Sequence, residues 1–278
     1  MMHSDETTAL AAKNQFTFSD LIRIMEKLRA PDGCPWDREQ THVSLKRYLI
    51  EESYEVLEAI DLQNDAMLCE ELGDVLLQIV FHANVSESFS IDNVITGICK
   101  KMITRHPHVF GNTTVENADE VLVNWEQIKQ QEKGIKDHAT ILKKVPPNLP
   151  ALMRAYKVQQ KAADAKFDWD QIEPVFDKVQ EELSEVREAM AGKNPEAIID
   201  ETGDLLFAMV NLSRFLKVHP ELALTAATEK FIRRFEKMET MLQLEQKVLE
   251  DMSLTQMDLY WEKAKTALRN CPEPDPHH

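Results

Sequence analysis

Glycine, paired cysteines and long apolar runs are all scarce in this sequence of 278 residues. Seven glycines are few for this length, while Leu, Glu, Ala, Lys and Met are plentiful, which favours helices over sheets. The four cysteines form no Cys-x-x-Cys pair, so we expect free thiols in a reducing compartment and no structural zinc site. The strongest apolar run, Val75–Phe81, is far too short to cross a bilayer.

Basic charge is also in short supply. The 48 acidic residues outnumber the 32 Lys and Arg residues, and the formal net charge is −16. This charge argues against general binding to nucleic acid or to an anionic membrane, because both select a basic surface. A small anionic substrate stays compatible, since a bound cation reverses the local field. The first residues lack the basic and apolar regions of a signal peptide, so we expect a cytoplasmic protein.

The apolar residues recur with helical spacing along most of the chain, which predicts an all-α fold. A run of three prolines among six residues, Val145–Pro150, is the best candidate for a linker. The order of helices and loops before this run recurs after it. We therefore expect two tandem, duplicated helical domains of the four-helix type. The expected segments are a disordered tail (1–15), a first domain (16–130), a linker (131–150), a second domain (151–270) and a C-terminal tail (271–278).

A pattern of acidic residues occurs once in each half with the same spacing. Glu71 follows Glu52 by the same 19 positions that separate Glu201 from Glu182. Each half carries a Glu-x-x-Glu pair and then a Glu-x-Gly-Asp motif, and acids that only face solvent have no reason to repeat in this way. The eight acids are Glu52, Glu55, Glu71 and Asp74 in the first half, and Glu182, Glu185, Glu201 and Asp204 in the second.

Residues three apart on a helix share a face, so each motif projects two carboxylates together. Four carboxylates from two adjacent helices repel one another strongly unless a cation joins them. Hard oxygen ligands suit Mg²⁺, with Mn²⁺ as a substitute, and Mg²⁺ commonly takes further ligands from substrate phosphates. Gly73 and Gly203 interrupt otherwise strong helices beside these acids. The repeat leaves open whether these glycines allow a ligand or another helix to approach.

A basic pair and a tryptophan motif follow the acids in each half. Cations at i and i+4 share one helix face and can hold phosphate oxygens. Trp36 and Trp169 follow turn signals before the acidic helices, and either could stack on a base or belong to the core. The basic pairs are Lys101 with Arg105 and Lys230 with Arg234, and the Trp-Glu-x-x-Lys motifs place Trp125 with Lys129 and Trp261 with Lys265.

These motifs together resemble the MazG family, which are bacterial nucleoside triphosphate pyrophosphohydrolases of the all-α pyrophosphatase superfamily. The resemblance covers about residues 18–265 and includes the tandem arrangement. Single motifs are weak, whereas their order and duplication are specific. The motifs are Gly-Cys-Pro-Trp-Asp at 33–37, the paired acidic motifs, Arg-His-Pro-His-Val-Phe at 105–110, and Phe-Asp-Trp at 167–169.

The resemblance implies a homodimer and a Mg²⁺-dependent hydrolysis of a nucleoside triphosphate to the monophosphate and pyrophosphate. It implies that Glu182, Glu185, Glu201 and Asp204 are the catalytic metal ligands, with the first-half acids as their counterparts. Glu181 or Glu51 could accept a proton from the attacking water. We expect the second half to be the main catalytic site. The implied nucleotide-binding residues are Lys178, Glu181, Lys230, Arg233, Arg234, Trp261, Lys265, Trp169, Lys101, Arg105, Trp125 and Lys129.

Three other readings compete with this one. A narrower enzyme of the same superfamily would act on dUTP and dCTP or on phosphoribosyl-ATP. A non-enzymatic helical protein would use its acids only to bind partners. A di-iron carboxylate bundle requires Glu-x-x-His pairs on two helices, and none accompanies these acids.

Overall fold

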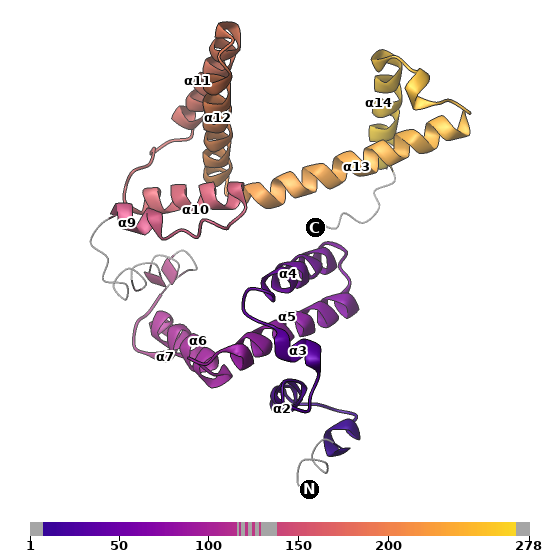
Figure 1. Ribbon diagram of the computed structural model, residues 1–278. Helices are drawn as coiled ribbons and strands as arrows, with labels where there is room; N and C mark the ends of the chain where they lie inside the picture. Colours follow the sequence, from indigo (N-terminus) through magenta and orange to yellow (C-terminus); the bar gives the residue numbers. More distant parts are fainter. Residues whose placement is uncertain are drawn as a thin grey trace. The chain divides into compact units, whose positions relative to one another are not determined.

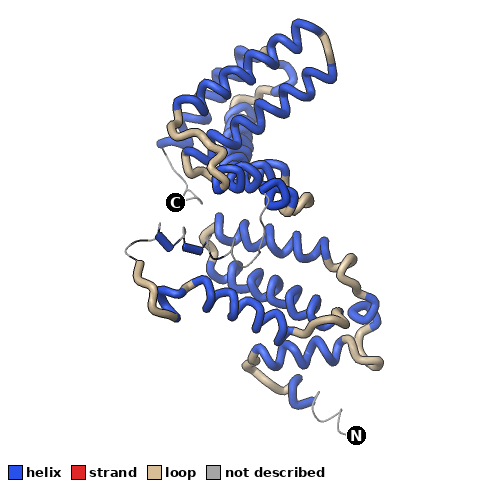
Figure 2. Tube along the Cα trace, turned by 90° about the vertical axis from the view of Figure 1, so that its left-hand side faces the viewer, coloured by secondary structure: helices blue, strands red, loops and turns tan. Residues whose placement is uncertain are grey.

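The computed structural model describes residues 8–115, 117, 120–121, 124–125, 128 and 138–270. Across these residues the chain consists of helices and connecting loops, with no strand (Figure 2). This confirms the predicted all-α class. The described residues form two compact units, one up to residue 128 and one from residue 138 (Figure 1). None of the described helices is long and apolar enough to span a membrane.

The first unit is built around the antiparallel pair α4 and α5, which pack along each other. Helix α2 packs across α5, and α6 follows α5 in the chain and contacts it. The short helices α3 and α7 each begin with proline in the first turn, a position where the missing N–H costs nothing. The bounds are α2 Phe18–Leu28, α3 Pro35–Glu39, α4 Lys46–Asp61, α5 Asp65–Val85, α6 Ile91–Arg105 and α7 Pro107–Phe110.

The second unit contains two helix pairs joined through α10. Helices α11 and α12 pack along each other, α13 packs with α14, and α10 contacts both α12 and α13 (Figure 1). Each pair therefore forms a separate arm of the unit. The bounds are α9 His138–Lys143, α10 Ala151–Asp164, α11 Glu173–Gly192, α12 Pro195–Phe215, α13 Pro220–Leu244, a 3₁₀ turn Leu249–Asp251 and α14 Leu254–Asn270.

An asparagine N-cap sets the start of the second acidic helix in each unit. The Asn64 side chain accepts a hydrogen bond from the Met67 N–H at 3.2 Å. The Asn194 side chain accepts from the Glu196 N–H at 3.1 Å. Such caps satisfy N–H groups that have no partner inside the helix and are worth about 1 kcal/mol. Both helices therefore begin at the same register relative to their Glu-x-Gly-Asp motifs.

Each unit has its own apolar core. Met25, Leu45, Val80 and Phe81 are buried together in the first unit, which ties α2 and the start of α4 to α5. In the second unit, Met238 and Leu242 of α13 pack with Tyr260 and Ala264 of α14. On the other arm, Val175, Ala208 and Val210 are buried. These small, separate cores fix the helix pairs one by one.

Helical periodicity predicts helices at about 18–29, 45–61, 66–85, 91–104 and 151–165, with turn or loop signals around 31–35 and 105–111. The structure places α2, α4, α5, α6 and α10 within one or two residues of these predicted bounds. The stretch expected as α-helix around 118–131 and the tail 271–278 lie mostly or wholly outside the described residues. Residues 8–11, within the segment expected to be disordered, are helical. In the segment expected to be a linker, α9 packs on α10 and Val145 is buried, so residues 138–150 are part of the second unit.

Replacing Leu45 by Ala should destabilise the first unit. Leu45 is 1% exposed and touches the core of α2 and α5, so its truncation should cost about 2–5 kcal/mol of unfolding free energy. Hydrogen exchange measured by mass spectrometry reports each unit separately, and peptides of α4 and α5 should lose protection.

Val43→Ala is the matched control, because Val43 is 78% exposed and its truncation should change the free energy by less than about 0.5 kcal/mol. Equal protection in Leu45→Ala and Val43→Ala would contradict the proposed core.

Candidate metal-binding site

Three acids of the second unit meet between α11 and α12. Glu182 projects from α11, and Glu201 and Asp204 project from α12, with one carboxylate oxygen of each within 4.8 Å of the others. Glu185 lies beside them on α11, where burial and then the charge of Glu182 raise its pKa. The structure thus brings all four predicted acids of this half to one place.

Glu182 is the buried member of this cluster, with 5% of its surface exposed. Its Oε1 forms an ion pair with Lys178 Nζ at 2.8 Å, and its Oε2 is buried without a hydrogen-bond partner. A buried, unpartnered carboxylate oxygen is rare in folded proteins because its desolvation goes uncompensated. Because the Glu182 carboxylate lies with those of Glu201 and Asp204, the simplest partner for the unpaired oxygen is a cation.

Lys178 acts as a counter-ion within the cluster. Its ammonium lies 2.8 Å from Glu182 and 2.9 Å from Glu181, one turn along the same helix. Hydrogen bonds to Glu182 and then to Glu181 raise the pKa of Lys178 above its ordinary value. One positive charge therefore offsets part of the repulsion among the four acids.

The first unit repeats the cluster without a lysine. Glu52 and Glu55 of α4 and Glu71 of α5 offer oxygens within 4.8 Å of one another. Burial, then the charge of Asp74 and a hydrogen bond with Glu55 raise the pKa of Glu52 to about 7. The residue that corresponds to Lys178 at the offset of 130 is Tyr48. Without an internal cation, this cluster lowers its repulsion by holding a proton near neutral pH.

Both clusters fit a hard divalent cation. All donors are carboxylate oxygens, the set that Mg²⁺ and Mn²⁺ accept, and none is the thiolate or imidazole that selects softer metals. In the first unit, burial and then the charge of Glu55 raise the pKa of Glu71. Burial first and the neighbouring acids second raise these pKa values, so a cation would be favoured at this place.

The two helical glycines leave open space beside the acids. A Cβ at Gly73 or Gly203 would meet no atom within 4 Å, so neither glycine serves close packing within the described part of the chain. Gly203 instead lines a shallow depression of about 440 Å³ with Asp200 and Asp204. The open space leaves room for a ligand or for a helix of another molecule, so both explanations of the glycines stay predictions.

Apart from Lys178, the predicted basic residues of the second half lie on the other helix pair, α13 and α14. Lys230, Arg233 and Arg234 belong to α13, and Lys265 of α14 forms an ion pair with Glu262 at 2.6 Å. Trp261 packs against Phe231, with ring centroids 5.0 Å apart. Among the described residues, no hydrogen bond or ion pair joins these side chains to the acids of α11 and α12. Within one chain, the basic residues of α13 and α14 therefore lie on a different helix pair from the acids, whereas Lys178 of α11 lies among them.

Two of the predicted nucleotide-binding residues of the first half, Arg105 and Trp125, lie side by side. The Arg105 guanidinium lies 5.5 Å from the centroid of the Trp125 ring, and His106 meets the same ring edge-on at 4.9 Å. Lys101 is on α6 with Arg105, whereas Lys129 lies outside the described residues. A ring nitrogen of His106 also lies 2.6 Å from the Met102 carbonyl oxygen, so this histidine helps to hold the end of α6.

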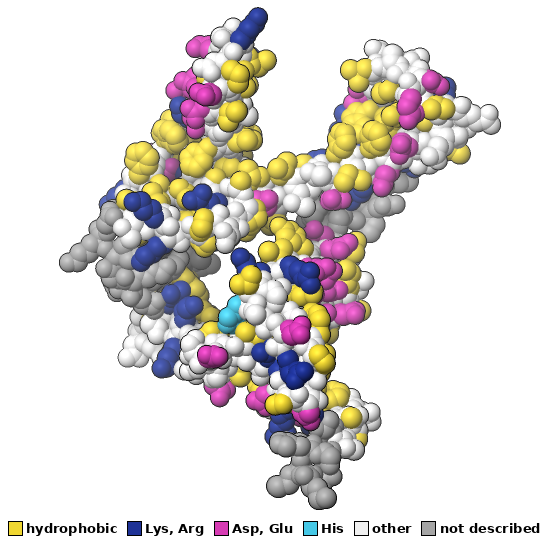
Figure 3. All heavy atoms as spheres, viewed as in Figure 1, with side chains coloured by type: hydrophobic (Ala, Val, Ile, Leu, Met, Phe, Trp, Pro, Cys, Tyr) yellow, Lys and Arg dark blue, Asp and Glu magenta, His cyan; other side chains and the backbone are white. Residues whose placement is uncertain are grey.

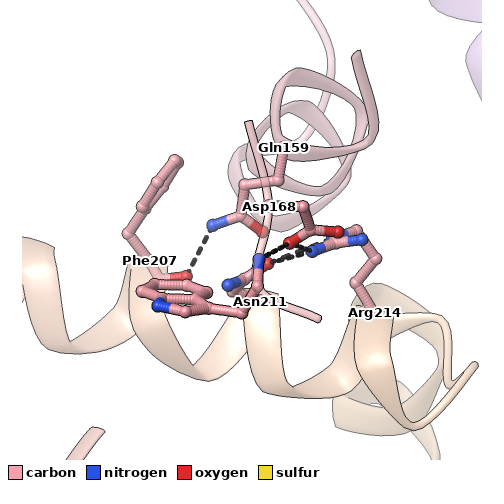
Figure 4. A network of polar contacts seen from close by, with 6 residues as sticks. Gln159, Asp168, Phe207, Asn211 and Arg214 are labelled. Atoms are coloured by element: carbon pink, nitrogen blue, oxygen red, sulfur yellow. Dashed lines mark hydrogen bonds and ion pairs between the residues drawn. The ribbon is translucent and has the colours of Figure 1, made fainter. Parts of the chain in front are cut away.

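Sequence reasoning missed a polar network that holds the Phe-Asp-Trp loop. Arg214 of α12 donates to Asp168 at 2.6 Å and to Asn211 at 2.8 and 3.0 Å (Figure 4). Gln159 of α10 donates to the Phe207 carbonyl oxygen at 2.8 Å. The only signal in the sequence was an Asn and an Arg three positions apart, which is too common to single out.

Comparisons with known proteins agree with this geometry. The MazG nucleotide pyrophosphohydrolase domain matches residues 40–110 and 172–238, which contain both acidic clusters. A nucleoside triphosphate pyrophosphohydrolase/pyrophosphatase MazG of Thermotoga maritima is 51% identical over 89% of this chain and 95% of its own length. The nucleoside triphosphate pyrophosphohydrolase of Escherichia coli K12 is 43% identical over 88% of this chain and 95% of its own length.

A Bacillus subtilis protein, YabN, is 49% identical over 91% of this chain, which spans 52% of that protein. Two tandem domain matches and high identity over nearly the whole chain leave one assignment: the chain belongs to the MazG family of nucleotide pyrophosphohydrolases.

Proposed function

We propose that this protein hydrolyses nucleoside triphosphates to the monophosphate and pyrophosphate, with Mg²⁺ at the acids of the second unit and Mn²⁺ as a substitute. The observation that carries the proposal is Glu182, which has a buried, unpartnered Oε2 and a carboxylate that lies with those of Glu201 and Asp204. The names of the relatives from Thermotoga maritima and Escherichia coli support the reaction. Such an activity would control the nucleotide pool or remove unwanted nucleotides from it.

Glu182, Glu185, Glu201 and Asp204 would hold the metal. When bound, the ion supplies Lewis-acid polarisation of the phosphate oxygens and of the attacking water. Glu181 lies next to the cluster and is the candidate proton acceptor, because Lys178 orients its carboxylate at 2.9 Å. The Lys178 ammonium, which lies 2.8 Å from Glu182, would stabilise negative charge on the phosphate chain beside the cluster.

In our proposal the protein forms a homodimer, and this assembly brings the basic residues of α13 and α14 to the acids of α11 and α12. Large apolar side chains are exposed on both arms of the second unit, and Figure 3 shows such side chains gathered on them. Contiguous exposed apolar surface commonly marks an interface. The exposed residues include Phe176, Ile199, Leu206, Phe207 and Met209 on one arm, and Leu222, Leu224, Phe231, Ile232 and Leu259 on the other.

The cytoplasmic location and the absence of nucleic-acid and membrane partners stay predictions from composition. The basic residues of the first unit, Lys101 and Arg105, remain candidates for a second nucleotide site. Trp261 and Lys265 remain candidates for contacts to the nucleotide from the arm formed by α13 and α14.

The second unit should carry the turnover. Glu182→Gln removes a charged ligand of the proposed metal site with little change in side-chain size and should lower kcat at least about 100-fold, because disturbing even the groups around a metal ligand costs about 10- to 100-fold. Glu52→Gln is the matched change in the first unit and should leave most of the activity. The assay measures pyrophosphate and monophosphate from each NTP and dNTP with Mg²⁺.

Product from dUTP and dCTP alone would favour the narrower enzyme. Orthophosphate as the sole product, or no product from any nucleotide, would overturn the proposed reaction, and loss of turnover only in Glu52→Gln would reverse the roles of the units.

In the metal-free protein, the stability of the first unit should depend on pH. The pKa of Glu52 is raised from 4.5 to about 7 in the folded state, so the folded protein holds this proton more tightly than the unfolded chain does. Unfolding free energy therefore falls as pH rises from about 4.5 to about 7 and stays low above it. In EDTA, Glu52→Gln should raise the melting temperature at pH 8 and change it little at pH 4.

With added Mg²⁺ at pH 8, wild type should instead have the higher melting temperature, because it binds the ion through Glu52 and the variant has lost that charge. Differential scanning calorimetry gives both comparisons. A melting temperature of Glu52→Gln that equals that of wild type in EDTA at pH 8 would contradict the repulsion.

A homodimer should elute with twice the 32.0 kDa mass of one chain in light scattering after size exclusion. The double variant Leu206→Glu, Phe231→Glu adds one charge to each apolar arm and should shift the mass toward one chain. Leu254→Glu, at an 81% exposed position at the start of α14, is the control and should leave the mass unchanged. If wild type has the mass of a single chain, the proposed homodimer is contradicted.

A further inference from the structure

Two histidines of the first unit meet where the loop before α4 reaches the last turns of α5. The Nδ1 atoms of His42 and His82 lie 2.9 Å apart, and the planes of the two rings differ by only 9°. The ring centroids are 5.2 Å apart, so the two nitrogens are the parts of the rings that face each other. Two nitrogens from separate elements of the fold are therefore presented at one point.

Both rings are held in place by their own surroundings. The loop that carries His42 is closed by two hydrogen bonds, from the Thr41 N–H to Ser44 Oγ at 2.9 Å and from the Ser44 N–H to Thr41 Oγ1 at 3.2 Å. The His42 ring lies parallel to Phe89, with centroids 6.3 Å apart. His82 is half-buried on α5, directly after a residue of the apolar core. The pair is thus positioned before any ligand arrives.

The second unit has apolar residues at the corresponding positions. At the offset of 130 that aligns the acids, His42 corresponds to Ile172 and His82 to Leu212, which is 9% exposed. The duplicated helices therefore form without these histidines, and apolar side chains would avoid the cost of burying polar nitrogens. The pair is a feature of the first unit that the shared fold does not require.

The pair is ready to act as a ligand near neutral pH. Burial and then the neighbouring His42 lower the pKa of His82, which keeps this ring neutral at pH 7. Neutral imidazole is the form that binds a metal ion. Within the described part of the chain, neither ring has another hydrogen-bond or ion-pair partner that would compete for its nitrogens.

The distance between the nitrogens is close to that of two ligands on one ion. Nitrogens bound at about 2.0–2.1 Å to a tetrahedral Zn²⁺ stand about 3.3 Å apart, so the pair has to open by about 0.4 Å. His42 is exposed on a loop, which allows a change of this size. Imidazole suits Zn²⁺ and similar ions, whereas Mg²⁺ prefers oxygen ligands.

We propose that His42 and His82 form a binding site for Zn²⁺ or a similar borderline divalent ion, separate from the acidic clusters in position and in chemistry. His82 follows Asp74 by eight residues, which is about 12 Å along the helix. Water completes the coordination, so the ion exchanges readily and is not a structural zinc. Its binding joins the loop before α4 to α5 and does not depend on the proposed function.

Calorimetric titration with Zn²⁺ tests the site, with excess Mg²⁺ present to occupy the acidic clusters. His82→Leu, which introduces the residue of the second unit, should weaken one class of Zn²⁺ site at least about 10-fold, because disturbing even the groups around a metal ligand costs about 10- to 100-fold. His42→Gln should weaken the same class. His108→Gln is the matched control, because His108 also lies beside a histidine, His106, and it should keep the affinity.

A second measurement identifies the residues directly. Diethyl pyrocarbonate modifies free imidazole, and mass spectrometry of peptides should show that Zn²⁺ slows the modification of His42 and His82 in wild type, whereas Mg²⁺ alone does not. Because His42 is exposed, His42→Gln keeps the test decisive if His82→Leu folds poorly. Equal Zn²⁺ affinity in wild type and His42→Gln, or equal modification of His42 with and without Zn²⁺, would overturn the inference and leave the pair as a hydrogen bond only.

Discussion

The repulsion among carboxylates on paired helices is the constraint on which the account depends. In each unit two neighbouring helices bring four acids together, and the packing that aligns the helices also prevents the acids from separating. Burial makes this repulsion larger, since fewer waters screen it. The asparagine caps that fix the start of α5 and α12 therefore also fix where the charges meet.

The two units relieve the same repulsion in different ways. The second unit places Lys178 on Glu182, while the first has Tyr48 at the corresponding position and a Glu52 that titrates near pH 7. The difference extends to the neighbouring loops, where Trp169 is tied by an ionic network and Trp36 by aromatic contacts. Duplication has preserved the acids and altered their surroundings, which is the pattern expected if the two sites have come to serve different purposes.

Much of the fold was predictable because the helices are long and carry strong local signals. Helical periodicity located α4, α5, α11 and α12, and the motif spacing paired their acids. The short helices α3 and α7 were read as loops, since proline and glycine signal a turn whether or not one helical turn follows. The involvement of 138–150 in the second unit depends on tertiary contacts of Val145 and α9, which no local pattern encodes.

The candidate site was predictable only in part, for a similar reason. Identical spacing identified the acids, but the unpaired oxygen of Glu182 and the contact between Arg214 and Asp168, which are 46 residues apart, depend on side-chain positions. The separation of the basic residues of α13 and α14 from the acids of α11 and α12 also follows from the path of α13, not from the motifs themselves. Sequence spacing gives the order of groups along the chain, whereas distance between helix pairs is decided by packing.

Binding of Mn²⁺ to the metal-free chain tests the central claim most directly. Electron paramagnetic resonance counts the bound ions without requiring turnover, and wild type should bind metal at both clusters. Glu182→Gln and Glu52→Gln should each weaken one class of site and leave the other intact. Unchanged binding in both variants would contradict the account, because the clustered acids would then not be the groups that hold the ion.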